Sequence, residues 1–189
     1  MTDISLKDLK SGSEEAFKEL VELHQDRVIN ICFRFLNNRE DAEDTAQDVI
    51  VEVYQSINRF RGEAKLSIWI YRIAVSKSLD RIRKMKTKKR MVQLKSLFGL
   101  EAHEEPAAPT ATKPDETLEQ QERAAILHRC VRELAENQEI AITLNKYNEF
   151  SYKEIAEIMG TSLSAVESLI HRGMKNLKEK LYLYYGQNF

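Results

Sequence analysis

Four carboxylates lie close together in the first third of the chain, at Glu40, Asp41, Asp44 and Asp48. Oxygen ligands of this kind suit hard cations such as Mg²⁺, so a metal-dependent hydrolase is one hypothesis. The four histidines are scattered, however, and the sequence offers neither a nucleophile–base pair nor a glycine-rich phosphate loop. Carboxylates in the first turns of a helix more often stabilise its dipole. We therefore expect no enzymatic activity, no metal and no cofactor.

Charge is strongly segregated along the 189 residues, although the formal net charge is only −1. Residues 1–60 carry a net charge of −6 and residues 61–95 one of +10. Residues 96–125 carry −5, and residues 126–189 are balanced. Such segregation suggests separate surfaces for separate partners, one of which is a polyanion.

Apolar residues recur at helical spacing and rarely alternate with polar ones, so the sequence predicts an all-α fold. One helix is predicted to begin at Ser13 and to end at Asn37–Asn38, and a second to begin with the carboxylates. The second helix should face solvent with its carboxylates and pack through Ala42, Ala46, Val49, Ile50, Val53, Tyr54 and Ile57. A third should pack through Ile68, Trp69, Tyr71, Ile73, Val75, Leu79 and Ile82 and end in a basic run.

All three prolines fall between residues 106 and 114, in a segment rich in alanine, threonine and glutamate. Because this segment lacks apolar periodicity, it predicts a flexible linker between two small helical domains. We place the N-terminal domain at residues 1–93, the acidic linker at 94–116 and the C-terminal domain at 117–189. In the C-terminal domain, helices are expected at about 117–134, 138–147, 152–159 and 163–184.

The two cysteines, Cys32 and Cys130, lie far apart within apolar patterns and form no C-x-x-C pair. We expect buried free thiols, without a zinc site or a disulfide. The N-terminal residues carry no apolar signal segment, and no run of roughly 18 apolar residues could span a bilayer. A cytoplasmic protein without membrane insertion is therefore predicted.

The stretch from Tyr152 to His171 has the spacing of a DNA-binding helix-turn-helix. Ala156 lets the helices cross closely, Gly160 occupies the turn, and Ser162 can cap the second helix. Docking in the major groove would present the N-terminal half of that helix to base edges. The candidate DNA-facing residues are Ser164, Ala165, Glu167, Ser168, His171, Arg172 and Lys175. An αα-hairpin without a DNA partner is the alternative.

Two further motifs precede the helix-turn-helix, REDAEDTAQDVIVEVY and FRGEAKLSIWIYRIAVSKSLDRIRK. Together with SAVESLIHRGMKNLKEKL they resemble the extracytoplasmic-function (ECF) group of bacterial RNA polymerase sigma factors, over nearly the whole chain except the linker. The resemblance implies an alternative sigma factor that binds core RNA polymerase and directs promoter-specific initiation, with domains like sigma regions 2 and 4. A stand-alone helix-turn-helix regulator is the alternative, although it leaves the first two motifs unused.

The resemblance also implies roles for individual residues. The first motif would dock on a coiled coil of the largest polymerase subunit through Asp41, Asp44, Gln47, Asp48 and Ile50. The second would melt the −10 promoter element through Phe60, Arg61, Gly62, Lys65, Leu66, Ser67, Trp69, Arg72, Ser76, Lys77, Arg81, Arg83 and Lys84. Of these, Trp69 is expected to pack within the protein more than to stack on a base. The helix-turn-helix would read the −35 element, and an anti-sigma factor is an expected partner.

Three residues depart from the family pattern. Ser76 stands where asparagine is common, and Glu167 and Leu169 stand where basic residues are common. A carboxylate at Glu167 should weaken phosphate attraction and alter base preference, so the upstream promoter element does not follow from that of typical members.

Overall fold

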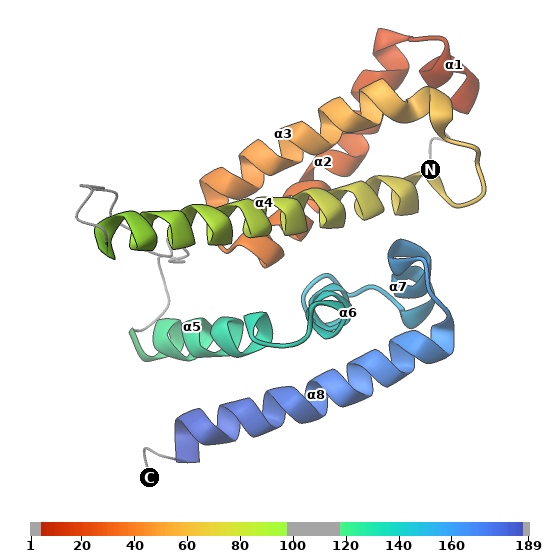
Figure 1. The fold of residues 1–189 in the computed structure, drawn as a ribbon. Coiled ribbons are helices and arrows are strands. Elements are labelled where there is room, and N and C mark those ends of the chain that lie inside the picture. The colour runs from red at the N-terminus through yellow and green to blue at the C-terminus, as the bar shows by residue number, and fades with distance from the viewer. Residues whose placement is uncertain (1–4, 98–117, 187–189) are drawn as a thin grey trace. The chain divides into compact units, whose positions relative to one another are not determined.

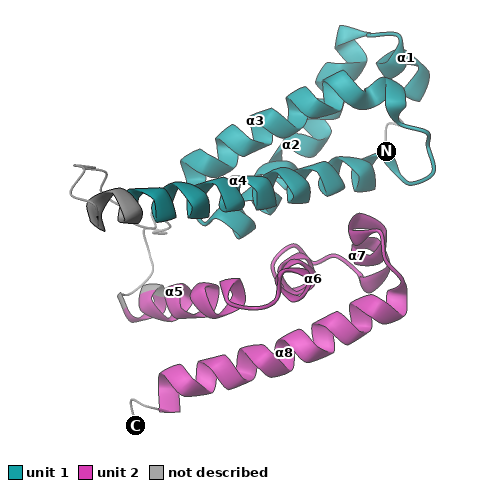
Figure 2. Ribbon diagram, viewed as in Figure 1, with its two compact units in different colours: residues 1–111 teal, residues 112–189 magenta. Residues whose placement is uncertain are grey.

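The computed structural model describes residues 5–97 and 118–186, and every regular element within those ranges is a helix. The chain divides into two compact units, residues 1–111 and 112–189, which Figure 2 colours separately. The predicted all-α fold is confirmed for the described residues. Most of the predicted linker, at residues 98–116, lies outside them, so its boundaries stay a prediction.

Unit 1 carries its described helices in the order α1 (Leu6–Lys10), α2 (Glu14–Leu36), α3 (Arg39–Ser56), the 3₁₀ turn η1 (Ile57–Arg59) and α4 (Leu66–Leu97). Helices α2, α3 and α4 pack against one another in pairs, and α1 packs against α2 and η1 (Figure 1). Apolar side chains from the three long helices form the core, among them Leu20, Val28, Ile31, Phe35, Val49, Val53 and Ile70.

Local capping sets the bounds of α2 and α3. Ser13 Oγ accepts a hydrogen bond from Ala16 N at 3.3 Å and so begins α2. Asn37 ends that helix in the left-handed region with φ 52°, which asparagine tolerates better than most residues. Asn38 Oδ1 then accepts from Asp41 N at 2.9 Å and begins α3. Both predicted boundaries are confirmed.

The core-facing side of α4 matches the predicted one in part, because Ile68, Val75 and Ile82 are buried as expected. Three further buried positions, Ile70, Ala74 and Ser78, recur at four-residue spacing and lie outside the predicted set. The predicted Trp69, Tyr71 and Ile73 are only half-buried. Since this stretch is apolar on several sides, its sequence left the facing direction open, and packing against both α2 and α3 decides it. The helix also runs on through the basic run to Leu97, into the predicted linker.

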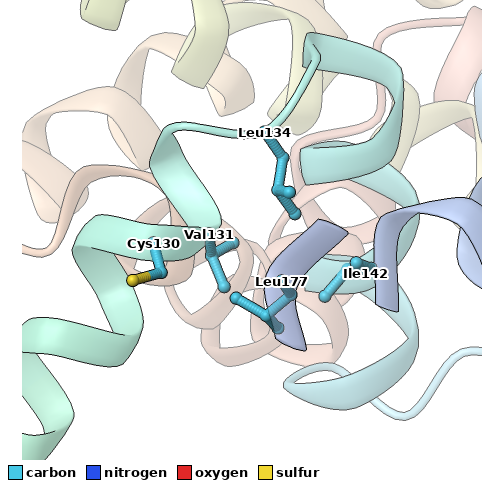
Figure 3. Close-up of a cluster of buried hydrophobic side chains, with 5 residues drawn as sticks. All are labelled: Cys130, Val131, Leu134, Ile142 and Leu177. Carbon is cyan, nitrogen blue, oxygen red and sulfur yellow. The ribbon is translucent and has the colours of Figure 1, made fainter. Parts of the chain in front are cut away.

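Unit 2 contains α5 (Leu118–Arg132), α6 (Glu136–Lys146), α7 (Tyr152–Met159) and α8 (Leu163–Gly186), within two residues of the predicted bounds at every end. Figure 3 shows a cluster that joins α5, α6 and α8, made of Cys130, Val131, Leu134, Ile142 and Leu177. Because the cluster packs side chains of these three helices together, it fixes the position of α8 against α5 and α6.

Both cysteines are buried free thiols, as predicted. Burial raises the pKa of the Cys32 thiol to about 11, so it stays protonated and unreactive at neutral pH.

Candidate nucleic-acid and protein interfaces

Helix α3 presents the acidic motif on one face. Asp44, Gln47 and Asp48 follow one another at helical spacing, and all three are exposed. Ile50 is half-buried at the edge of the same region. The face therefore offers two carboxylates and an amide to a partner, beside some apolar surface.

Asp41 does not face solvent with the other carboxylates. Its Oδ1 accepts a hydrogen bond from Arg81 Nη2 of α4 at 2.5 Å, and only 19% of its side chain is exposed. Asp44 Oδ2 lies 4.0 Å from the same guanidinium. The hydrogen bond to Asp41 and the charges of Asp41, Asp44 and Asp48 raise the pKa of Arg81 above its usual value. The expectation of a uniformly solvent-facing acidic side is wrong at Asp41, because α4 packs there.

Two apolar residues extend the exposed face of α3, and sequence reasoning missed both. Val51 is 52% exposed, and Tyr54 is 58% exposed although its periodicity placed it in the core. The Tyr54 ring instead packs edge-on against Phe17 of α2, with centroids 5.0 Å apart. Val51 falls three residues after Asp48 and Tyr54 three after Val51, so this spacing was the available signal.

The cations of α4 fall into two groups. Lys77 and Arg81 turn toward α3, where Lys77 Nζ lies 3.4 Å from Glu52 Oε2. Arg72 and Lys84 are exposed, and so is the uncharged Ser76. Arg83 is also exposed, and its contact at 3.0 Å with Asp80 is a surface pair of the kind that contributes little. The structure thus divides the cations that the sequence grouped together.

The loop between η1 and α4 is anchored at Phe60. That side chain is only 7% exposed, and its ring packs on the half-buried Trp69 with centroids 5.1 Å apart. Gly62 follows with φ 76°, a backbone conformation that favours glycine. Arg61 and Lys65 are exposed, whereas Leu66 and Ser67 are half-buried. Phe60 is therefore a buried anchor of this loop, and its exposed neighbours form the outer surface.

A further anchor comes from α1. Lys10 Nζ donates to the carbonyl oxygen of Phe60 at 2.7 Å. No local pattern in the sequence marks this residue, because its partner lies 50 positions away.

The helix-turn-helix is present in unit 2. Ser151 and Glu154 form a capping box at the start of α7, and Gly160 ends the helix with φ 64°. Ser162 Oγ accepts from Ala165 N at 3.2 Å and caps α8, as predicted. Residues of both helices share a core through Ile155, Ile158, Val166 and Ile170.

The outer face of α8 carries the predicted DNA-facing residues. Ala165 is half-buried, and the exposed ones are Ser164, Glu167, Ser168, His171, Arg172 and Lys175. Glu167, Ser168, His171 and Arg172 also line a shallow hollow. Arg172 Nε donates to Ser168 O at 3.2 Å, which holds its guanidinium along the helix. The face thus mixes one carboxylate with donors that can reach base edges or phosphates.

Across residues 5–97 and 118–186, no three histidine, cysteine or acidic side chains come together as a metal site would require. No helix among the described residues has the length and apolar character to cross a bilayer.

Comparison with known proteins assigns both units. The family model of Sigma-70 region 2 matches residues 20–88, and that of Sigma-70, region 4 matches residues 116–177. The ECF RNA polymerase sigma factor SigW of Bacillus subtilis (strain 168) is 30% identical over 177 residues, which cover 93% of this chain and 94% of SigW. The chain belongs to the ECF RNA polymerase sigma factors. As an ECF sigma factor, it is an alternative sigma factor that directs transcription initiation.

More distant sigma-factor relatives span the chain as fully. The ECF RNA polymerase sigma-E factor of Escherichia coli (strain K12) is 25% identical over 182 residues, covering 96% of this chain and 95% of the relative. The RNA polymerase sigma-H factor of Pseudomonas aeruginosa is 25% identical over 175 residues, covering 92% and 90%. The comparisons do not support a stand-alone regulator. A helix-turn-helix regulator would account for unit 2 only and would leave the region 2 match of unit 1 unexplained.

Two solved structures share the fold of this chain. CnrH, solved in complex with the cytosolic domain of CnrY, has a TM-score of 0.64 and 20% identity, covering 93% of this chain and 94% of CnrH. The sigma factor RpoE from Bartonella quintana, solved with the anti-sigma factor NepR, has a TM-score of 0.60 and 21% identity, covering 87% and 96%.

Proposed function

We propose that unit 1 of this sigma factor binds core RNA polymerase through the exposed face of α3. Asp44, Gln47 and Asp48 would pair with basic side chains on a coiled coil of the largest subunit, and Ile50 would add apolar contact. Asp41, which is held by Arg81, would sit at the inner edge of this face. The exposure of the carboxylates along one face of α3 is the observation that supports this assignment most directly.

The loop from Phe60 to Ser67 and the outer side of α4 are the proposed site of −10 melting. Opening a duplex requires an unstacked base to be held in a pocket and the single strand to be held on a basic surface. Arg61, Lys65 and Lys84 are exposed and suited to follow phosphates. The remaining proposed contacts are Gly62, Leu66, Trp69, Arg72, Ser76, Lys77, Arg81 and Arg83. Lys77 and Arg81 each pair with a carboxylate on α3 and would contact phosphate through their remaining donors.

Unit 2 is proposed to read the −35 element with the N-terminal half of α8. Ser164, Ser168, His171 and Arg172 would face bases, and Lys175 would lie near phosphate. Glu167 can accept a hydrogen bond from cytosine N4, so its presence would shift base preference. The capped start of α8 supports this role by fixing the direction of these side chains.

An anti-sigma factor is the proposed regulatory partner. Two proteins that share the fold were solved with a partner. CnrH was solved with the cytosolic domain of CnrY, and RpoE with the anti-sigma factor NepR. We place the protein in the cytoplasm, where core polymerase acts, and propose no catalytic activity, metal or cofactor of its own.

Reconstitution with core polymerase and a library of promoter sequences tests these proposals together. Transcripts should begin at defined start sites only when the sigma factor, core enzyme and promoter are all present. Tight promoter binding by the sigma factor alone, without start-site selection by the holoenzyme, would instead favour a regulator.

A further inference from the structure

Helix α1 touches the loop that is proposed to open the promoter, although it lies upstream of the Sigma-70 region 2 match at residues 20–88. Lys10, the last residue of α1, donates from Nζ to Phe60 O at 2.7 Å. The neighbouring Leu9 is buried, and α1 packs against η1, the turn that leads into the loop. The short helix is therefore attached to the loop entrance by the Lys10 hydrogen bond, and α1 itself packs on the turn before it.

The contacts converge on Phe60. Its N–H donates to Ile57 O at 3.1 Å, its carbonyl accepts from Lys10, and its ring packs on Trp69. Immediately beyond it, the exposed Arg61 and Gly62 begin the outer part of the loop. The direction in which the chain leaves η1 is thus fixed at one residue, and Lys10 supplies the contact that comes from outside the region 2 match.

We propose that Lys10 is a positioning residue for promoter melting. Its ammonium holds the Phe60 carbonyl, which sets the path of the loop and preorganises it to receive an unstacked −10 base. A hydrogen bond from a charged donor is stronger than a neutral one, so it can fix a loop entrance where neutral contacts would not. This inference rests on the proposed melting function of the loop.

A direct phosphate contact by Lys10 is the competing role, because an ammonium has three donors and Phe60 uses one of them. The two roles differ in their dependence on salt. A lysine that contacts phosphate contributes to counterion release, so its loss reduces the salt slope of DNA binding by about one. A lysine that only positions the loop leaves that slope unchanged.

The test measures the rate of open-complex formation by holoenzyme on a promoter with 2-aminopurine in the −10 element. Lys10→Met keeps the aliphatic stem and removes the ammonium, and we expect opening about three- to tenfold slower, which is the effect of losing one partly exposed charged hydrogen bond. Lys10→Arg, which keeps a charged donor, should retain most of the parent rate. Lys7→Met, on an exposed position of the same helix, is the matched control and should open like the parent.

Two further readouts separate positioning from a general loss of structure. Affinity for core polymerase and the urea midpoint reported by Trp69, the single tryptophan, should match those of the parent. On a template whose −10 region is already unpaired, the Lys10→Met defect should shrink. If Lys10→Met lowers the urea midpoint, Lys10→Gln is the variant to test instead. The glutamine amide can still donate to Phe60 O but carries no charge, so we expect a rate of opening between those of the parent and Lys10→Met.

The inference is overturned if Lys10→Met opens DNA at the parent rate, if Lys7→Met is equally slow, or if the salt slope falls by about one. A parent holoenzyme that opens no promoter would overturn the proposed function itself. Promoter opening by the parent holoenzyme therefore distinguishes failure of the Lys10 inference from failure of the proposed function.

Discussion

The Arg81 guanidinium of α4 donates to the Asp41 carboxylate of α3 at 2.5 Å, across 40 positions of sequence. The family resemblance assigns these residues to different partners, Asp41 to polymerase and Arg81 to promoter DNA. In unit 1 each neutralises the other. A change at either residue is therefore expected to alter the surface assigned to its neighbour.

Substitution of this pair should reveal coupling in stability. Arg81→Met is expected to lower the free energy of unfolding of unit 1 by up to about 1 kcal/mol, because the pair is partly exposed and screened. Asp41→Asn should cost a similar amount, and the double variant should cost less than the two single changes combined. Urea denaturation followed by Trp69 fluorescence measures all three.

The matched control for this cycle is Arg83→Met. Arg83 and Asp80 form an ion pair on the surface of α4 in which both side chains are more than half exposed. Its loss should change the urea midpoint less than Arg81→Met does. Strictly additive losses at Asp41 and Arg81 would show that the contact contributes no coupling.

Charge reversal on the acidic face should weaken polymerase binding. Asp48→Lys places a cation where a basic partner surface is expected, and like charges across an interface cost several kcal/mol, so affinity should fall by about tenfold or more. The defect should be smaller at high salt, where charges are screened. Competition of labelled and unlabelled sigma factor for core enzyme gives the affinity.

Asp26→Lys makes the same charge change at an exposed position of α2 and serves as the control. It should bind core enzyme like the parent. Equal affinity of Asp48→Lys and the parent would remove the acidic face of α3 from the polymerase interface.

The stability of unit 1 should depend on the protonation of His24. This side chain is buried beside Tyr71, with Nδ1 3.2 Å from the hydroxyl, and desolvation lowers its pKa below the ordinary value of 6.5. The unfolded chain therefore binds the proton more tightly, so the free energy of unfolding rises with pH through this range. The stabilisation is fully present above pH 6.5 and is lost as pH falls toward the folded pKa.

Urea titrations with Trp69 fluorescence between about pH 5 and pH 8 test this dependence. His24→Gln should flatten the rise, whereas His171→Gln, at an exposed position of unit 2, should leave it unchanged. An identical pH dependence in the parent and His24→Gln would assign the effect to other groups.

Arg172 should contribute to promoter selection without affecting assembly with core enzyme. Arg172→Ala is expected to reduce discrimination between promoters with intact and altered −35 elements by about 1–3 kcal/mol, the value typical of one lost base contact. Paired-template transcription measures the ratio, and core affinity should stay at the parent value. Lys153→Ala, exposed on α7, is the control. Unaltered discrimination in Arg172→Ala would exclude Arg172 as a determinant.

Helix positions were predictable from the sequence where short-range chemistry sets them. Ser13, Asn38 and Ser162 cap helices through backbone groups three residues away, and Gly160 supplies the φ that the turn requires. The facing direction of α4 was predicted only in part, because that helix carries apolar residues on several sides, and of the neighbours Trp69 and Ile70 only Ile70 is fully buried.

The sequence by itself determined the all-α class, the helix-turn-helix and the motifs of an ECF sigma factor, since each depends on residues within a few turns of one another. Only the tertiary structure decided that Asp41 pairs with Arg81, that Tyr54 is exposed on α3, and that Lys10 holds Phe60. Those contacts depend on how whole helices cross. Crossing is set by the combined packing of many side chains, which no local spacing encodes.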